Sequence, residues 1–373
     1  MEQLIQEGVL FYFHRIEDPR VLKRCKHRLI DVIAIAVCAR ICGAESFVEM
    51  EEFGIQRELW FKEFLELSNG IPSHDTFCRV FSILEPRALE LAFQEWVKSI
   101  RKTLSPCARV SLDGKTVNGT YPKFNGVTRP LVLVNAFCHD SGLTLTQAQA
   151  PSTGNAETKA ALACIDDLDL EKALVSVDAG VGRRSVLTRL IEKKAHYLVP
   201  VKSNARTQFL ELKIHIKKLK KEKFFEFASN KEENSHGRNE KRQCFVMDSK
   251  GLSERFKLSY PEVKSVIEIE RIRNREKTNW MYVSSKKLNA EAALHEIRDH
   301  WKIENRLHWS LDVIFDEDGC RVREKVAARN LSLIRKIAFN LLQTCPQKGS
   351  KLVKIKRAAW NPEYLQNLLI NNT

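Results

Sequence analysis

Two acidic residues each follow a short apolar run and come just before a glycine. Asp113 follows Val110 and Leu112 and precedes Gly114, and Asp178 ends the run 173–177 ahead of Ala179-Gly180. The runs predict strands. Each carboxylate would then emerge at a strand end, where open α/β sheets place their ligands. An Asp-Gly turn in a surface hairpin is the alternative interpretation.

A third acid, Glu304, lies one helical turn after His300-Trp301 and one turn before His308-Trp309. The apolar side of such a helix packs on the sheet and would carry Glu304 inward with it. A surface glutamate in a salt bridge is the alternative. Three other acids are open as the third ligand: Asp312, Glu317 and Asp318.

Three clustered carboxylates favour a hard cation such as magnesium, which keeps several waters and completes its shell with substrate phosphates. We therefore predict a phosphoryl-transfer site in which Asp113, Asp178 and Glu304 are both catalytic residues and metal ligands. A metal-free pair of acids, as in a glycosidase, is the competing interpretation. It leaves the positive charge of the chain unexplained. The sequence also lacks GxxxxGK[ST], HExxH and GxSxG motifs.

The chain is basic, with 61 Lys+Arg against 47 Asp+Glu, a net charge of +14 and a pI near 9.3. Such an excess favours a polyanionic partner, although a merely basic soluble protein would share it. The longest apolar stretch, Val32 to Ala39, is too short to cross a bilayer, which takes roughly 20 residues. The amino terminus shows no export signal, so we expect a cytoplasmic protein with no membrane contact and without disulfides.

Residues 1 to about 104 are expected to form a helical domain, for which binding of DNA ends is one interpretation. Arg28 to Cys42 and Pro86 to Lys102 have apolar residues at helical spacing. Between them, Pro72-Ser73 begins a short helix that would present His74 and Arg79 outward. This segment is either a helix-turn-helix that touches DNA or an ordinary helical cap on the core.

Residues 105–373 change to an alternating α/β pattern with flanking helices. Strands are expected near 110–113, 131–137, 143–148, 173–177 and 197–201, with helices at 157–168 and 183–194. Three antiparallel strands followed by helix, strand, helix and strand is the order of a ribonuclease H-like mixed sheet. A basic, strand-containing insertion at about 205–285 should form its own small sheet, and a long helix after Asn289 should carry Glu304.

Several stretches resemble the H-repeat-associated transposases of bacterial insertion sequences. They are Ser111–Thr116, Val177–Ala179, Tyr197–Asn204, His236–Arg238 and above all Ile297–Val313, which contains HWKIENRLHW. The resemblance runs along the whole chain and includes Asp18–Arg20, Cys42–Glu45, Gly70–Thr76 and Lys356–Leu365. The HW-x2-EN-x-LHW block is long and specific, whereas DGKT and VDA alone are weak.

The resemblance implies a ribonuclease H-like core whose DDE triad falls on Asp113, Asp178 and Glu304. It also implies two Mg²⁺ or Mn²⁺ ions that serve strand cleavage and strand transfer on double-stranded DNA. The DNA would be the terminal inverted repeats of the encoding element and its target, held by a homodimer. A catalytically impaired or domesticated DNA-binding remnant is the alternative.

Two loops depart from the family pattern. Where the family shows DAxGxQ this chain has Val181 and Arg183, and where it shows KGNQ the last position is Ala205. Lost glutamines would remove contacts to DNA or to water. Six residues are candidates for contacts with DNA, with a structural role open for each: Lys115, Lys202, Asn204, His300, Asn305 and His308.

Overall fold

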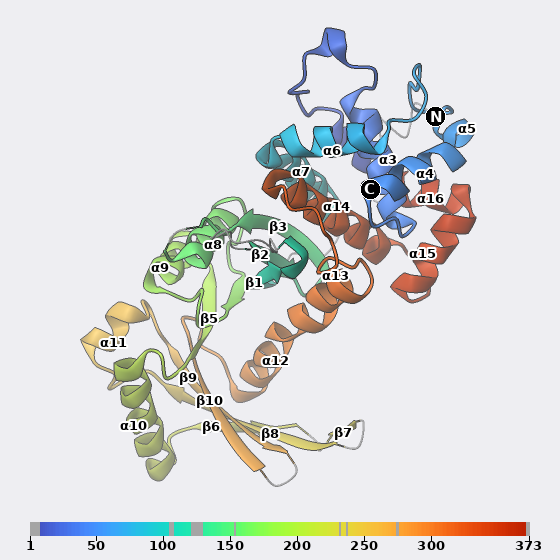
Figure 1. The fold of residues 1–373 in the computed structure, drawn as a ribbon. Coiled ribbons are helices and arrows are strands. Elements are labelled where there is room, and N and C mark those ends of the chain that lie inside the picture. Colours follow the sequence, from blue (N-terminus) through green and yellow to red (C-terminus); the bar gives the residue numbers. More distant parts are fainter. Residues whose placement is uncertain are drawn as a thin grey trace.

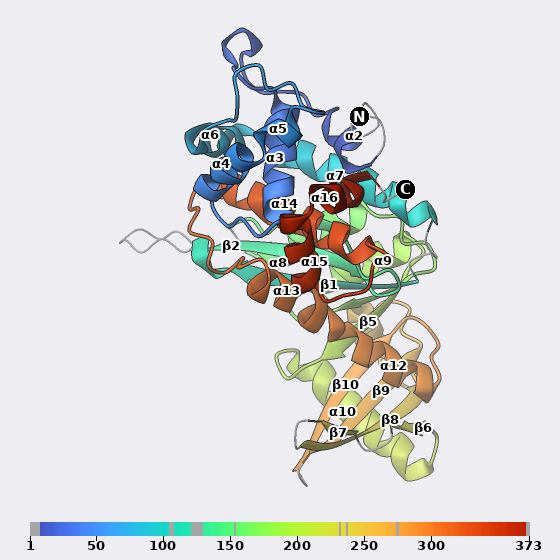
Figure 2. The ribbon, with the colours of Figure 1, turned by 90° about the vertical axis from the view of Figure 1, so that its right-hand side faces the viewer.

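The computed structural model describes residues 8–103, 108–120, 130–152, 154–230, 233–235, 238–273 and 276–370. A central sheet lies between a helical unit, which contains both ends of the chain, and an extension of the sheet (Figure 1). The turned view in Figure 2 shows the same succession along the long direction of the molecule. His236 and Gly237, which belong to the family resemblance, lie outside the described residues.

The central sheet has the predicted ribonuclease H-like topology. Strands β1 (Arg109–Val117), β2 (Leu131–Cys138) and β3 (Leu143–Gln149) pair in antiparallel fashion. On its other side β1 pairs in parallel with β4 (Leu174–Val177), and β4 pairs in parallel with β5 (His196–Val201). The resulting order is β3-β2-β1-β4-β5. Asp178 follows the last residue of β4, as expected. Asp113 does not end its strand: it lies in the middle of β1, one residue beyond the part that pairs with β4, because β1 continues to Val117 in antiparallel pairing with β2. Both aspartates therefore lie where the parallel pairing ends, at the carboxyl edge of the parallel strands.

Helices α8 (Ala156–Asp166) and α9 (Arg184–Glu192) connect the strands, as expected for a parallel crossover. Helix α9 buries Val186, Leu187 and Leu190 on one side, a spacing that follows from the helical period. The sequence therefore predicts both helices correctly to within a few residues.

The basic insertion does not form a separate sheet, contrary to the expectation. Its last strand pairs in antiparallel fashion with β5, so that the order continues β5-β10-β9-β8-β6, with β7 beside β8. The pairing satisfies the edge of β5, whose peptide groups would otherwise stay open. The elements of the insertion are α10 (Arg206–Glu222), β6 (Glu226–Ser229), β7 (Glu233–Ser235), β8 (Arg238–Asp248), α11 (Glu254–Ser259), β9 (Ser265–Arg273) and β10 (Glu276–Ser284).

The helical unit is assembled from both ends of the chain. Its first part comprises α2 (Val9–Phe13), η1 (Leu22–Arg24), α3 (Leu29–Ile41), α4 (Phe47–Gln56), α5 (Glu58–Phe61), α6 (His74–Ile83) and α7 (Pro86–Thr103). Its second part comprises α14 (Lys325–Thr344), α15 (Lys351–Trp360) and α16 (Pro362–Ile370). Every residue of α3 is buried, and α14 packs against α3, α6, α7 and β3. One hydrophobic core therefore runs through the helical unit and the sheet.

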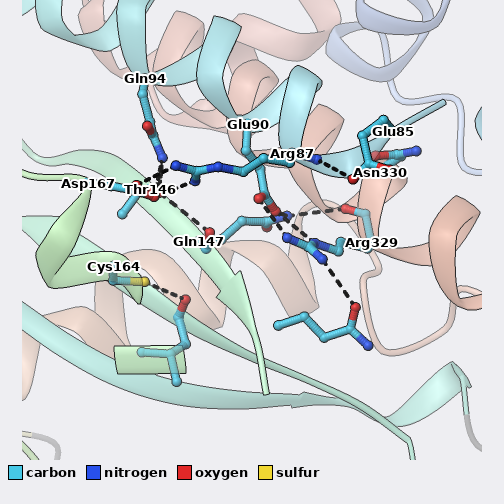
Figure 3. Close-up of polar contacts among 12 residues, drawn as sticks. Glu85, Arg87, Glu90, Gln94, Thr146, Gln147, Cys164, Asp167, Arg329 and Asn330 are labelled. Atoms are coloured by element: carbon cyan, nitrogen blue, oxygen red, sulfur yellow. Dashed lines mark hydrogen bonds and ion pairs between the residues drawn. The ribbon is translucent and has the colours of Figure 1, made fainter. Parts of the chain in front are cut away.

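Polar contacts hold this unit against the sheet (Figure 3). Glu90 of α7 accepts hydrogen bonds from Arg329 of α14 at 2.8 and 2.7 Å and from Gln147 of β3 at 3.3 Å. Arg87 of α7 donates to Asp167, just after α8, at 2.6 and 2.5 Å. The bonds to Glu90 satisfy a buried charge that would be costly without partners, whereas the Arg87–Asp167 pair lies at the surface.

The helix expected after Asn289 is present but interrupted. It consists of α12 (Ala290–His300), a π-helical turn η3 (Glu304–His308) and α13 (Trp309–Val313). A short 3-10 turn, η2 (Asn118–Thr120), follows β1. Cys138 at the end of β2 is disulfide-bonded, so the expectation of a chain without disulfides is wrong at this residue. Within the described ranges, no helix has the length and apolarity of a membrane span.

Candidate active site

The strand register brings Asp113 and Asp178 to neighbouring positions. Leu112 of β1 lies opposite Val177 of β4 in the parallel pair, so the next residue on each strand is an aspartate. Asp113 is largely buried, with 16% of its side chain exposed, whereas Asp178 is more open at 40%. The two acids therefore share the carboxyl edge of the sheet but differ in their exposure to water.

The π-helical turn places Glu304 and His308 above Asp113. His308 Nδ1 lies 3.3 Å from Glu304 Oε2 and 3.7 Å from Asp113 Oδ2. One ligand atom from each of the three side chains lies within 4.8 Å of the others, a spacing that suits a single cation. An extra residue in a helical turn is a common way to re-aim side chains at a functional site. Asp113 and Glu304 are far apart in the sequence, and the fold brings them together at β1.

The electrostatics of Asp113 reflect this crowding. Burial raises the pKa of its carboxyl to about 7; the imidazole of His308 acts in the opposite direction, and the carboxylates of Glu304 and Asp178 raise it further. The pKa of Glu304 is lowered, first by its hydrogen bond with His308. Glu304 is therefore ionised, whereas Asp113 carries a proton that it exchanges readily.

Asp178 lies outside the close group of Asp113, Glu304 and His308. Burial raises the pKa of Asp178, but the hydrogen bond from Lys202 and the backbone N–H groups of Ala179 and Gly180 outweigh it, and the pKa is lowered. The Lys202 ammonium donates to Asp178 Oδ1 at 2.8 Å. Lys202, expected as a DNA contact, thus neutralises this carboxylate in the protein without DNA.

His300 anchors the end of α12 to the sheet. Its Nδ1 lies 2.9 Å from Ser176 Oγ, and Ser176 Oγ in turn lies 2.7 Å from Ser111 Oγ. Ser111 continues the chain to His139 Nε2 at 2.6 Å. Burial lowers the pKa of His300 to about 4, so the ring is neutral. This buried chain of hydroxyls and imidazoles fixes the residue four positions before Glu304.

The three alternative acids face Lys115. The ammonium of this buried lysine lies 2.5 Å from Asp312, 3.1 Å from Asp318 and 3.5 Å from Glu317. Carboxylates that surround an ammonium are compensated, and they have less to gain from a cation than the crowded pair at Asp113. The structure thus gathers these acids into a separate ionic cluster, and Lys115 lies within it.

The remaining candidate DNA contacts lie on the surface. Asn204 is exposed and lines a hollow with Lys202. Asn305 is exposed next to Glu304, and its Nδ2 donates to the Trp301 carbonyl at 3.3 Å. Both side chains are open to a ligand that approaches the carboxyl edge of the sheet.

The sequence interpretation missed Glu157 in the first turn of α8. A Cβ built on Gly114 would lie 3.4 Å from Glu157 Oε1, and one on Gly180 would lie 3.6 Å from Glu157 Oε2. The glycines that follow both aspartates therefore leave room for a fourth carboxylate. The sequence signal that could have identified Glu157 is its position at the start of a crossover helix, because that end of the helix faces the same edge of the sheet.

A ribonuclease H-like sheet with acids on two adjacent parallel strands, where their pairing ends, and a third on the helical segment after the insertion defines the class of DDE nucleic-acid-processing enzymes. The family model described as "Transposase DDE domain" matches residues 109–341, and the model "DDE_Tnp_1-associated" matches residues 10–97. The chain belongs to this family of DDE transposases.

Two of its relatives match nearly its whole length. The chain is 34% identical to "Putative transposase YncI" of Escherichia coli O157:H7, over 97% of this chain and 94% of that protein. It is 30% identical to "H repeat-associated putative transposase YhhI" of Escherichia coli K12, over 95% of each. Among solved structures it is similar to the piggyBac transposase synaptic complex with hairpin DNA, with a TM-score of 0.41, 9% identity and coverage of 100% of this chain and 77% of that chain.

Proposed function

We propose that this transposase cleaves DNA strands at the ends of its own insertion sequence and joins them to target DNA, with Asp113, Asp178 and Glu304 as its catalytic residues. The observation that carries the proposal is the convergence of Asp113 and Glu304 beside Asp178 at the carboxyl edge of the sheet. The net charge of +14 is consistent with a double-stranded DNA partner.

The site has the chemistry of a divalent metal site, as the family implies. Oxygen donors from Asp113 and Glu304 lie with the His308 nitrogen within 4.8 Å of one another. Burial, and after it the carboxylates of Glu304 and Asp178, raises the pKa of Asp113, so a bound cation would stabilise its ionised form. Asp113, Asp178 and Glu304 would hold two Mg²⁺ or Mn²⁺ ions. Bound ions of this kind activate an attacking oxygen and stabilise the leaving oxygen of a phosphodiester.

The protein's own groups prepare this chemistry. Lys202 orients Asp178 through its 2.8 Å hydrogen bond. His308 orients Glu304, and the chain from His300 to Ser176 holds the preceding turn in place. We propose that a homodimer holds the two ends of the element, because cleavage at both ends needs two such sites.

The departures at Val181, Arg183 and Ala205 favour a second candidate, a DNA-binding remnant without catalysis. Val181 is buried, while Arg183 is exposed beside Asp178 and Ala205 precedes α10. None of the three replaces a member of the proposed triad, and the triad geometry therefore favours the enzyme.

Cleavage of linear DNA that carries the element's terminal inverted repeats tests the choice. With Mg²⁺, the wild type should cut, whereas Asp113→Asn, Asp178→Asn and Glu304→Gln should bind the DNA without cutting it. Asp312→Asn is the matched control, because this acid lies on the same helical segment and faces Lys115 instead. If the wild type and all variants bind equally and none cuts, the remnant is the correct assignment.

A further inference from the structure

A hollow of about 740 Å³ opens beside Asp178, between the core of the sheet and the insertion. The loops after β4 and β5 form one side, and α11 forms the other. The hollow is lined by Arg183, Arg184, Lys202, Asn204, Arg255 and Leu258, among others. Its size and its position next to a proposed catalytic residue suit part of a substrate larger than the reacting group.

The lining of this hollow carries three arginines without acidic partners, beside Lys202, which pairs with Asp178. It includes Arg183, Arg184, Lys202 and Arg255 but no aspartate or glutamate. Across the described ranges, no carboxylate lies within ion-pair distance of the three arginines, all of which are exposed. Other cations near the core are compensated: Lys115 faces three acids within 3.5 Å. Uncompensated cations gathered in a concave surface attract a polyanion.

Two helices add to this potential. Helices α9 and α10 both begin at the hollow, and neither Arg183 nor Ala205, their N-cap residues, makes a side-chain cap hydrogen bond. The N–H groups of a first helical turn are left over by the helix itself and carry a partial positive charge. They favour phosphate oxygens as partners, in addition to the three exposed arginines.

The hollow continues the line of the proposed active site. The strand order β1-β4-β5 places Asp113 and Glu304 at β1, Asp178 at β4 and Lys202 at β5. Neighbouring strands lie about 4.8 Å apart, so the acidic residues at β1 and the basic residue at β5 are separated by about 10 Å along this edge of the sheet. A DNA strand with one phosphate over the acids would place its next phosphates over the cations.

We propose that this hollow binds the sugar-phosphate backbone of the flanking DNA, just beyond the phosphate that is cut. The binding is independent of sequence, because contacts to phosphates position DNA but do not read its bases. This assignment rests on the proposed function, since it takes the acidic cluster as the place of cleavage. It gives Arg183 and Arg184, in the loop that departs from the family pattern, a role in holding substrate.

The salt dependence of DNA binding tests the proposal. Two duplexes that carry the terminal repeat are compared without divalent ions: one ends at the cleavage position, and one continues about 10 base pairs beyond it. For each phosphate that a side chain no longer neutralises, the slope of log Kd against log salt decreases by about 0.9. For the triple variant Arg183→Ala, Arg184→Ala and Arg255→Ala, the slope should therefore decrease by about 2 to 3 on the longer duplex only.

Arg189→Ala is the matched control. Arg189 lies on the same helix α9 but outside the hollow, where it pairs with Asp166 at 2.6 Å and Glu192 at 2.9 Å. It should bind both duplexes with the wild-type slope. Thermal denaturation of each variant verifies that the exposed substitutions leave the fold intact.

The outcomes separate this proposal from the proposed function. If the triple variant keeps the wild-type slope on the longer duplex, or shows the same decrease on both duplexes, the hollow does not hold the neighbouring DNA. Cleavage by the wild type that the three acid variants abolish would still support the transposase. If the slope on the longer duplex decreases as expected while the wild type never cuts, the proposed DNA binding by the hollow is supported and the catalytic proposal is wrong.

Discussion

The raised pKa of Asp113 leads to a prediction about metal binding. A carboxylate must lose its proton before it binds a cation, and burial raises the pKa of Asp113 from 3.8 to about 7. The rise corresponds to about 4 kcal/mol of free energy that ionisation costs in the folded protein. We predict that the Kd for Mg²⁺ or Mn²⁺ increases about tenfold for each unit by which the pH falls below about 7 and is constant above it.

The sign of the effect on stability follows from the same shift. The folded state binds this proton more tightly than the unfolded state, whose Asp113 pKa is near 3.8. Without metal, the fold therefore gains stability as the pH falls from about 7 towards 3.8. The increase in Tm caused by a saturating divalent ion should be larger above pH 7 than at pH 6, because below pH 7 the ion must displace a proton.

Calorimetric titration with Mn²⁺ in buffers of different ionisation enthalpy measures the released proton directly. Near pH 6, binding should release almost one proton per site, and near pH 9 almost none. In His308→Asn the pH dependence should move to higher pH, since the imidazole lowers the pKa of Asp113. Asp312→Asn is the control and should titrate like the wild type. A Kd that is flat from about pH 6 to 8, or proton release that disappears in His308→Asn, would refute the reasoning.

Two further predictions concern stability and are read by chemical denaturation. Gly182→Ala should lower the free energy of unfolding by about 1 to 3 kcal/mol, because its Cβ would lie 2.3 Å from Val199 Cγ2. Gly154→Ala, whose Cβ would have no atom within 4 Å, is the control. Equal stability of the two variants would contradict the packing argument. Lys336→Met should lower the free energy of unfolding by about 3 to 5 kcal/mol, because it removes a buried cation 3.8 Å from the buried Glu317 carboxylate. A loss of stability below about 1 kcal/mol would mean that this ion pair does not stabilise the fold.

The sequence predicts the frame of the site because its signals are local. The apolar runs before Asp113 and before Asp178 predict the two strands, although β1 continues beyond Asp113 to Val117, and the parallel pairing of β1 with β4 brings the two aspartates together. The crossover helices α8 and α9 show their apolar period in the sequence and occur as expected. These features depend on a few consecutive residues, and tertiary packing does not override them.

Other features depend on contacts between distant segments. The pairing of β10 with β5 is a choice of edge partner, which strand propensity does not encode. The π-helical turn at Glu304 breaks a pattern that has the ordinary helical period on both sides. The burial of Lys115 among three acids could likewise not be predicted from the sequence, because these acids come from a segment some two hundred residues further along the chain.

The packing of α14 against α3 constrains how the protein emerges from the ribosome. The buried helix α3 has α14 as one of its packing partners, and α2 contacts α16, so the first hundred residues cannot complete their core until residues 325–370 have been made. At an elongation rate of roughly 5 to 20 residues per second, α3 waits about 15 seconds or longer for this partner. A product truncated before α14 would expose an apolar helix and become a substrate for proteases, and only full-length copies would accumulate.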